Sequence, residues 1–547
     1  MVNMTRQQPG LLRENRVVIA HIYTATAAIV LGAFFGVLQG FARTSAFSLP
    51  SWFDYYRVLT MHGVLMALVF TTFFITGLCL FVTYRSILRP RRMTAGWLGW
   101  SVMLIGTAMA AVTIMQGDAT VLYTFYAPLK ASPWFYIGAT LLIVGTWIVA
   151  FEIFENIVWF RRANPGVPVP LAVFTVGCTF LMWVVATLGV VAEMYFLIPW
   201  AFGWTPGINV MMTRMFFWYF GHPLVYFWIM GAYIIWYNII PTRYNGYVFS
   251  DGLTRLTFVM LLLLSTPVGI HHQFMEPAIS STWKMLHTLT TYGVAIPSFL
   301  TAFAIFASFE LAAMKLGKRG FLATVKSLPW DDPAFSGAGF GMLLFILGGF
   351  GGLINASYSM DTLVHNTIWI VGHFHVTVGG PAALTFIGCA YWLIPKITGR
   401  ALWNPPLALW QTRIWFGGML VMSLSMHYAG LLGAPRRTAD VSYLGAAAAN
   451  AWEPYMLIAA AGGFFLFVSI CMFATVALGT LFANDKTADM QAEFALPAPG
   501  AQPTPMFLQP LFRWGALALV LAVLAYAGPV HDMLQHPGFL APGMRTW

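Results

Sequence analysis

The stretch MFFWYFGHPLVYFWIMGAYIIWYNIIP, residues 215–241, contains no charged side chain from one end to the other. A helix needs about 20 apolar residues to cross a bilayer, so this run predicts a membrane-spanning helix. A histidine, His222, lies inside it. Because a polar ring in hydrocarbon costs several kcal/mol unless something binds it, and because neutral imidazole is the commonest metal-ligating side chain, the run also indicates a metal site.

The rest of the chain has the same apolar character. Of its 547 residues, 59% are hydrophobic and 8% are charged, whereas soluble domains carry roughly 25% charged residues. The runs lack the alternation of a β-barrel, and helices are then the spanning element that remains. We therefore expect an all-α integral membrane protein with about 13 transmembrane helices, in the runs 17–41, 60–84, 96–116, 134–158, 169–198, 215–241, 255–277, 284–311, 337–358, 366–395, 406–432, 453–483 and 512–534.

These runs divide the chain into three parts. Residues 1–485 hold twelve of the predicted helices, residues 486–511 form an Ala- and Pro-rich linker, and residues 512–547 hold the thirteenth helix and a C-terminal tail. Lysines and arginines gather at alternate ends of the helices, and the positive-inside rule then places the N-terminus in the cytoplasm. The formal charge of +10 fits such cytoplasmic arginines and does not indicate a partner nucleic acid.

Five further histidines accompany His222 in or beside these runs. With the N-terminus inside, all six fall in the outer half of the membrane, which indicates one layer of cofactors: His62, His222, His271, His272, His373 and His375. A lone intramembrane histidine is more often a packing residue, and we assign that interpretation to His21, His287, His427, His531 and His536.

Helical geometry divides the six among separate centres. Residues two apart on a helix point about 200° apart, so His373 and His375 are expected to serve two neighbouring centres. The adjacent His271 and His272 converge on one ion only with a third ligand from another helix, and His222 is the candidate. Three imidazoles without carboxylate or thiolate suit copper, and zinc less well. A single axial histidine with an open position suits a gas-binding heme, and a pair suits an electron-transfer heme.

Three motifs carry a family resemblance: Gly221-His222-Pro223-Leu224-Val225-Tyr226, His271-His272, and Gly372-His373-Phe374-His375. With them the chain resembles subunit I of the heme-copper oxygen reductases, over nearly its whole length. It is most similar to the B-type branch, cytochrome c oxidases whose subunit I has thirteen helices. The resemblance implies the heme-copper oxidase subunit I fold, with the hemes and copper in the twelve-helix core of residues 1–485.

The resemblance also implies a role for each ligand. It assigns a low-spin heme, usually heme b, to His62 and His375, the iron of a high-spin heme, a-type or similar, to His373, and the copper ion to His222, His271 and His272. The catalytic residue would be Tyr226, four positions after His222 and on the same helix face. In the family this pair is covalently linked, and the tyrosine supplies an electron and a proton for O–O cleavage. Away from a metal site, such a tyrosine would be a packing or interfacial residue.

A proton path and a heme-carboxylate site complete the expected set. Tyr233 and Tyr237 are spaced so that each falls within about 20° of Tyr226 around a helix. Together with Ser298 and Thr301, the three tyrosines match the proton path of B-type oxidases; a structural aromatic stripe is the alternative. A-type oxidases usually carry Glu at the position of Leu224 for a second path, so we expect one path. Paired arginines suit heme propionates, and the resemblance implies cofactor-binding roles for Arg436, Arg437, Asp361 and His365; an ordinary interfacial arginine pair is the alternative.

We therefore expect a terminal respiratory oxidase. It would reduce O2 to water at a high-spin heme/copper binuclear centre, with electrons delivered through a low-spin bis-His heme, coupled to proton uptake and pumping. A nitric oxide reductase on the same scaffold is the alternative, and a transporter or heme-handling protein is a third class. Because the four cysteines stand alone in apolar runs, a partner subunit II would carry the dicopper centre that receives electrons from cytochrome c or another small redox donor. The expected location is a bacterial or archaeal plasma membrane.

Overall fold

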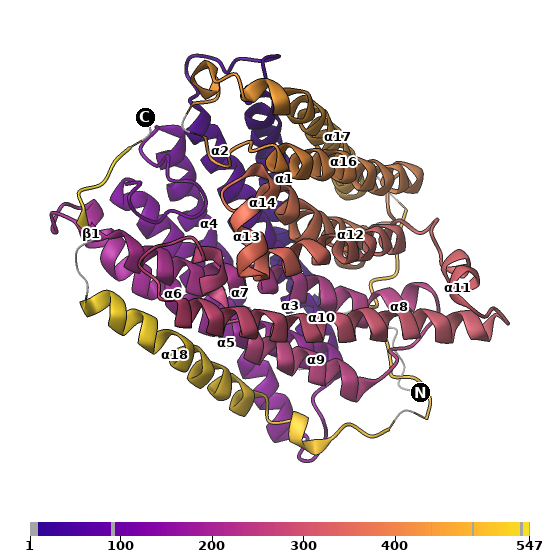
Figure 1. The fold of residues 1–547 in the computed structure, drawn as a ribbon. Coiled ribbons are helices and arrows are strands. Elements are labelled where there is room, and N and C mark those ends of the chain that lie inside the picture. The colour runs from indigo at the N-terminus through magenta and orange to yellow at the C-terminus, as the bar shows by residue number, and fades with distance from the viewer. Residues whose placement is uncertain are drawn as a thin grey trace.

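The computed structural model describes residues 9–88, 93–438, 440–483, 486–500, 502–535 and 540–545, with side chains described from residue 13 onward. Residues 1–8, at the predicted cytoplasmic N-terminus, and His536 lie outside the described residues. Figure 1 shows a bundle of long helices. The strands of the described part are β1 (Ile208–Asn209) and β2 (Leu540–Ala541), an antiparallel pair with Ile208 opposite Ala541.

Within these ranges, twelve helical stretches are long and apolar enough to cross a membrane. In two of them a short π-helix joins two α-helices, and a third consists of α7 followed by α8. The stretches are α1 (Pro9–Ala42), α2 (Tyr55–Gly63) with η1 (Val64–Phe70) and α3 (Thr71–Ser86), α4 (Thr94–Met115), α5 (Pro133–Ala163), α6 (Leu171–Ala201), α7 (Val210–Asn238) with α8 (Ile240–Arg243), α10 (Ser281–Lys315), α12 (Pro333–Ala356), α14 (Ile368–Phe374) with η3 (His375–Gly379) and α15 (Gly380–Thr398), α16 (Pro405–Leu431), α17 (Ala449–Phe482) and α18 (Leu511–Gln535). Short helices lie in the connections: α11 (Phe321–Ser327), α13 (Tyr358–Val364), η4 (Tyr443–Gly445) and η5 (Met506–Leu508).

The run 255–277 accounts for the remaining predicted helix, but it is broken. Helix α9 (Asp251–Leu264) ends before Pro267, and a separate 3₁₀-helix, η2 (Gly269–Gln273), follows. Proline has no N–H to donate and disfavours the helical conformation in the residue before it, which explains the break. Twelve long helices and one interrupted helix agree with the expected all-α protein of about 13 spans. The break places His271 and His272 on a short turn.

Both π-helices lie beside predicted heme ligands. His62 is the second-last residue of α2, and only Gly63 separates it from η1. His375 is the first residue of η3. In η3 the N–H of Gly380 donates to the carbonyl of His375, five residues back, and the next residue, Pro381, donates no hydrogen bond. Single π-helical turns occur frequently at functional sites because they change the direction of side chains along a helix.

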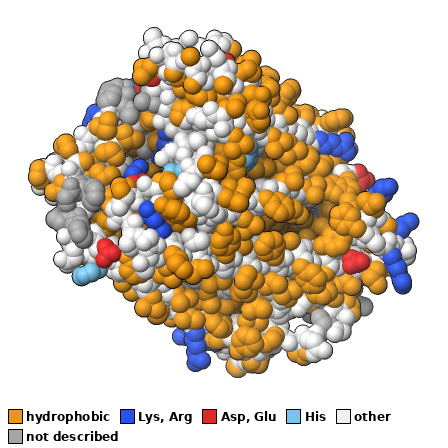
Figure 2. All heavy atoms as spheres, viewed as in Figure 1, with side chains coloured by type: hydrophobic (Ala, Val, Ile, Leu, Met, Phe, Trp, Pro, Cys, Tyr) orange, Lys and Arg blue, Asp and Glu red, His pale blue; other side chains and the backbone are white. Residues whose placement is uncertain are grey.

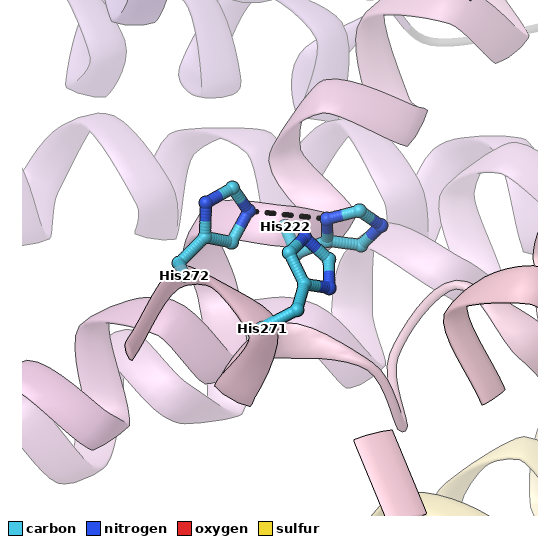
Figure 3. Close-up of side chains that lie close together, drawn as sticks. All are labelled: His222, His271 and His272. Atoms are coloured by element: carbon cyan, nitrogen blue, oxygen red, sulfur yellow. Dashed lines mark hydrogen bonds between the residues drawn. The ribbon is translucent and has the colours of Figure 1, made fainter. Parts of the chain in front are cut away.

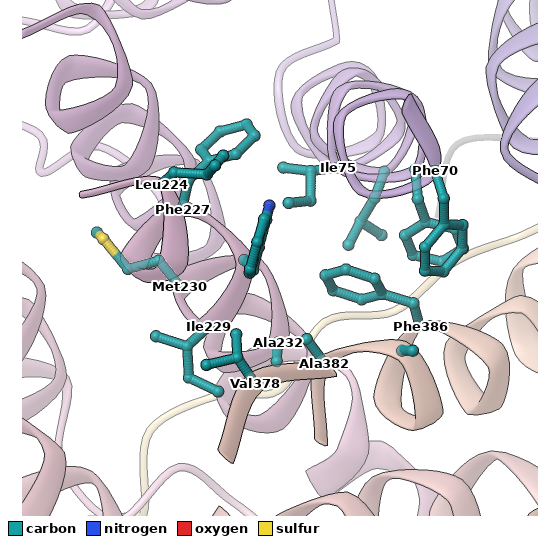
Figure 4. Packing of buried hydrophobic residues seen from close by; sticks show 14 of the residues in the cluster. Phe70, Ile75, Leu224, Phe227, Ile229, Met230, Ala232, Val378, Ala382 and Phe386 are labelled. Atoms are coloured by element: carbon teal, nitrogen blue, oxygen red, sulfur yellow. The ribbon is translucent and has the colours of Figure 1, made fainter. Parts of the chain in front are cut away.

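Close packing of small and apolar residues holds the helices together. The α4–α5 pair is one example, since a Cβ added to Gly106 would lie 2.4 Å from the carbonyl oxygen of Gly138, and small residues let membrane helices approach in this way. Figure 4 shows the interior, where Phe70, Ile75 and Phe386 face Leu224 and Phe227 of α7. The face of the molecule in Figure 2 is largely hydrophobic, as a lipid-facing surface requires.

The segment after α17 crosses the ends of several helices before α18. Ala488 donates its N–H to the carbonyl of Gly399, and Val248 donates its N–H to the carbonyl of Leu496. Helix α18 then packs through its buried face, which includes Ala518 and Ala522, on the outside of α6 and α9 (Figure 1). Residues 486–500 thus contact the core through their backbone, and α18 returns along the bundle.

Candidate metal centres

Three imidazoles converge from two segments of the chain. His222 lies in the middle of α7, and His271 and His272 lie on η2 (Figure 3). One ring nitrogen of each lies within 4.8 Å of one nitrogen of each of the others. The Nδ1 of His222 and the Nε2 of His272 are 3.2 Å apart. The structure therefore brings together the three residues that the sequence analysis groups on one ion.

The donor set and spacing fit a single metal ion. Metal–imidazole bonds of about 2.0–2.1 Å at tetrahedral angles separate two ligating nitrogens by about 3.3 Å, close to the observed 3.2 Å. The three rings contribute nitrogen only, the donor set that suits copper. The Nε2 of His222 is buried and has no hydrogen-bond partner among the described residues.

Neighbouring groups orient two of the three rings. The Thr291 hydroxyl donates to the carbonyl of His287, so it is left to accept from the Nδ1–H of His271 at 2.9 Å. This hydrogen bond places the proton of His271 on Nδ1 and leaves Nε2 free to bind a metal. The ring of Trp218 stacks on His272, with ring centres 4.0 Å apart. Neither Thr291 nor Trp218 was predicted from sequence, because nothing in the linear pattern marks a residue that acts through a ligand.

Tyr226 lies one helical turn after His222, and its ring lies close to the imidazole. The two ring centres are 4.8 Å apart, and the ring planes are inclined by 57°. The sequence spacing predicts this proximity because residues four apart share a helix face. A phenol thus lies beside the imidazole triad.

His62 and His375 face each other across a second centre. Their ring centres are 6.3 Å apart, and their planes are within 8° of parallel, a distance too long for direct stacking. Two axial iron–nitrogen bonds of about 2 Å, with about 1.1 Å from each nitrogen to its ring centre, place ring centres about 6.2 Å apart. The Nδ1 of each ring hydrogen-bonds a backbone carbonyl, of Gly32 and of Val371, both at 2.8 Å. The pair fits two ligands of one heme iron, which the Nε2 of each ring would bind because each Nδ1 is hydrogen-bonded.

A cavity adjoins this pair of rings. A cavity of about 250 Å³ borders both rings, with mainly apolar walls. A Cβ on Gly36 would lie 2.7 Å from the Nδ1 of His62, so glycine there lets helix α1 approach the ring. A second, smaller cavity is bordered by His373, His271 and His272, and both cavities share four wall residues: Ile370, Phe374, Arg436 and Arg437.

His373 faces this second cavity, away from the His62–His375 pair. Its Nδ1 lies 2.9 Å from the hydroxyl of Thr377, and its ring lies beside Trp369, with centres 5.7 Å apart. A Cβ on Gly351 would lie 2.5 Å from the same Nδ1, so α12 also approaches closely. His373 and His375 therefore border different cavities, which is the arrangement that their spacing predicts.

The arginine pair forms the polar part of the wall that the two cavities share. Burial and the neighbouring charge of Arg437 lower the pKa of Arg436 to about 10. Arg437 donates to the Tyr126 hydroxyl at 2.8 Å, while its Nη2 is buried and has no partner within the described ranges. Burial alone would raise the pKa of Tyr126, but Arg437, Arg214 and Arg436 outweigh burial and lower it to about 8. Such a concentration of buried positive charge fits a carboxylate-bearing ligand.

Asp361 and His365 border the second cavity together. The Asp361 carboxylate and the His365 Nδ1 are 2.8 Å apart. They lie on and after α13, which precedes the helix that carries His373. Tyr126 joins this region as a residue that the sequence analysis missed, because it lies in a loop without a recognisable motif.

The tyrosine stripe runs along α7 toward α10. The hydroxyl of Tyr233 interacts with Ser298 and Thr301, and the hydroxyl of Tyr237 interacts with Thr301 and Thr257. Neither phenol hydroxyl has a direct hydrogen-bond partner in the part of the chain that is described. Thr257, on α9, extends the predicted set by one residue.

Comparisons with known proteins agree with this geometry. The profile of the family described as "Cytochrome C and Quinol oxidase polypeptide I" matches residues 16–465. A cytochrome c oxidase subunit 1 of Thermus thermophilus is 38% identical over 98% of this chain and 97% of its own length. A heme-copper oxidase subunit I+III of Aeropyrum pernix is 26% identical over 63% of this chain and 43% of its own length. A cryo-EM structure of a heme-copper terminal oxidase dimer superposes with a TM-score of 0.93 at 34% identity, covering 97% of this chain and 95% of the other.

Proposed function

The chain belongs to the heme-copper oxidase subunit I family and is a terminal oxidase catalytic subunit, and we propose that it is the B-type form, a proton-pumping cytochrome c oxidase. The observation that carries the proposal is the triad of His222, His271 and His272 with Tyr226 beside it. Leu224, where A-type oxidases usually have Glu, and the tyrosine stripe toward Ser298 and Thr301 support the B-type branch.

Family membership implies heme and copper, and we assign each to its residues. His62 and His375 would hold a low-spin heme. His373 would hold a high-spin heme, and the triad of His222, His271 and His272 would hold copper. When bound, these groups supply electrons and the oxygen-binding position. Arg436 and Arg437 would bind the heme carboxylates, with Asp361 and His365 close to them.

The protein residues then control protons. Tyr226 would donate a proton, and an electron, from its hydroxyl to the oxygen substrate, and its ring lies beside that of His222. Tyr233, Tyr237, Thr301, Ser298 and, as an addition, Thr257 would return protons from the cytoplasmic side. Buried hydroxyls without a direct partner cost about 1–3 kcal/mol each, and bridging water would remove that cost and connect them.

Replacing Thr301 by valine is expected to slow steady-state oxygen consumption by at least about 10-fold, because it removes the hydroxyl that both tyrosines approach. Reduction of the hemes by an artificial donor should stay normal. The matched control is Thr288→Val on the same helix, whose hydroxyl makes the same kind of backbone bond, to Lys284. Equal turnover in both variants would contradict a proton path through Thr301.

Replacing His62 by alanine is expected to remove the low-spin heme, because one axial ligand is lost and His375 alone faces the cavity. Pyridine-hemochrome analysis should give about one heme per chain in place of two, and copper should be retained. A variant that keeps both hemes and an unchanged low-spin absorption band would show that His62 is a packing residue.

Family membership and the distribution of basic residues also support a membrane location, an orientation of the chain and a partner subunit. This chain is a multi-pass protein of the bacterial or archaeal plasma membrane. We propose that its N-terminus is cytoplasmic, because Arg161, Arg162 and Lys315 would then lie on the cytoplasmic side. A partner subunit II would carry the dicopper centre and accept electrons from cytochrome c or another small redox protein.

Metal and heme analysis of the purified complex tests the proposal. Two hemes and one copper in this subunit, in addition to copper in a partner subunit, are the expected result. Non-heme iron in place of copper at the triad would instead identify a nitric oxide reductase on the same scaffold.

A further inference from the structure

The segment that carries His271 and His272 is held by groups on two other helices. After Pro267 the chain starts a new 3₁₀-turn, whose first N–H groups have no partner within the turn itself. The N–H of Gly269 donates to the Tyr526 hydroxyl on α18 at 3.0 Å, and the N–H of Ile270 donates to the Nδ1 of His287 on α10 at 3.3 Å. The position of the turn is thus defined by α10 and α18 as well as by its own backbone.

His287 links these two helices through its other nitrogen. Its Nε2–H donates to the carbonyl of Ala525 on α18 at 3.3 Å, and its ring packs edge-on against Tyr526, with centres 5.1 Å apart. Since Nδ1 accepts and Nε2 donates, both bonds require the neutral ring in one tautomer. His287, which the sequence analysis assigned to packing, therefore joins the turn to α18.

The turn also packs closely against two helices at Gly269. A Cβ on Gly269 would lie 2.1 Å from the carbonyl oxygen of Trp218 on α7 and 2.4 Å from the Tyr526 hydroxyl. The backbone of α7 and the side chain of α18 thus enclose Gly269 from two sides. Trp218 itself stacks on His272. A displacement of Tyr526 would therefore shift the histidine rings in two ways, through the backbone of the turn and through α7.

We propose that α18 is a clamp for the three-imidazole site, in which Tyr526 and His287 are positioning residues that hold His271 and His272 in the geometry that retains copper. Copper at this triad is itself part of the proposed function. In this role α18 contacts α10 and η2 in order to fix the copper ligands. Tyr526 and His287 would then act on the site through the ligands, without contacting a cofactor themselves. Partners that orient a ligand typically contribute 10–100-fold to metal affinity.

The test measures copper retention in the purified holo-complex. Wild type and variants are dialysed against a copper chelator, and the copper-to-heme ratio is followed over time; the low-spin heme absorption band reports that the fold is intact. The stretching frequency of CO transferred to the reduced copper after photolysis gives a second, spectroscopic readout. The variants are Tyr526→Phe, His287→Leu and His287→Asn, whose amide oxygen keeps an acceptor close to the position of Nδ1.

We expect Tyr526→Phe and His287→Leu to lose copper at least about 10-fold faster than wild type, with a broadened CO band, and His287→Asn to recover part of the loss. The matched control is Trp283→Phe, which removes another α10–α18 hydrogen bond, to Asp532 at 2.7 Å, without touching the turn; it should behave as wild type. Wild-type retention in both Tyr526→Phe and His287→Leu would overturn the clamp, as would equal copper loss in Trp283→Phe. A wild-type complex whose triad holds no copper would overturn the proposed function and the clamp together.

Discussion

Replacing His222 by alanine is expected to abolish oxygen reduction, lowering turnover by about 1000-fold or more, because the several kcal/mol that a bound metal contributes are lost. His271 and His272 are adjacent on one turn and cannot retain an ion well without a ligand from α7. The copper-to-heme ratio in this subunit should fall close to zero while both hemes remain. Atomic absorption combined with hemochrome analysis, on the same sample as the oxygen-electrode assay, measures all three quantities.

The control for this variant removes a different buried imidazole. His21 lies on α1, is fully buried, and bonds only the backbone carbonyl of Val17 in the described contacts. His21→Leu should keep copper, hemes and turnover. If His222→Ala retained copper at the wild-type ratio, the triad would not be the copper site, and the proposed function would lose its main support.

Replacing Tyr226 by phenylalanine is expected to lower turnover by at least about 100-fold, because a positioned proton donor contributes about 10²–10⁴-fold. The ring is kept and only the hydroxyl is removed, so the packing against His222 should change little. Both hemes and copper should be present at wild-type ratios. This combination, a full set of metals without activity, separates Tyr226→Phe from His222→Ala.

Tyr391 provides the comparison for this variant. It is a buried tyrosine on α15 whose hydroxyl donates to the Gln411 side chain at 2.9 Å. Tyr391→Phe removes a better-bonded hydroxyl than Tyr226→Phe and should nevertheless leave turnover within about 2-fold, since it is outside the tyrosine stripe. Normal turnover in Tyr226→Phe would mean that the phenol beside the triad has a structural role only.

Several features of the fold and of the site depend only on residues that are close together in the sequence. The all-α membrane class follows from the length and apolar character of the runs, because a bilayer leaves helices as the way to satisfy the backbone. The division of His373 from His375 follows from helical geometry, and the proximity of Tyr226 to His222 follows from four-residue spacing. These relations are local in the chain, so the residues alone are sufficient to predict them.

Other features depend on segments that are far apart in sequence. Pro267 marks a break within the run 255–277, but only the folded chain shows that Gly269 reaches Tyr526, 257 positions away. The same holds for Thr291 beside His271 and for Tyr126 beside Arg437. Side chains that orient a ligand carry no pattern of their own, because the contact depends on where two helices meet.

The sequence alone therefore predicts the chemistry, namely which side chains can bind metal and which apolar runs carry them. The tertiary structure decided the geometry, which includes the 3.2 Å between two imidazole nitrogens of the triad, the 6.3 Å between the rings of His62 and His375, and the contacts that hold η2 in place. The physical reason is that ligand type and helix period are properties of short segments, whereas distances between helices arise from close packing of the whole bundle.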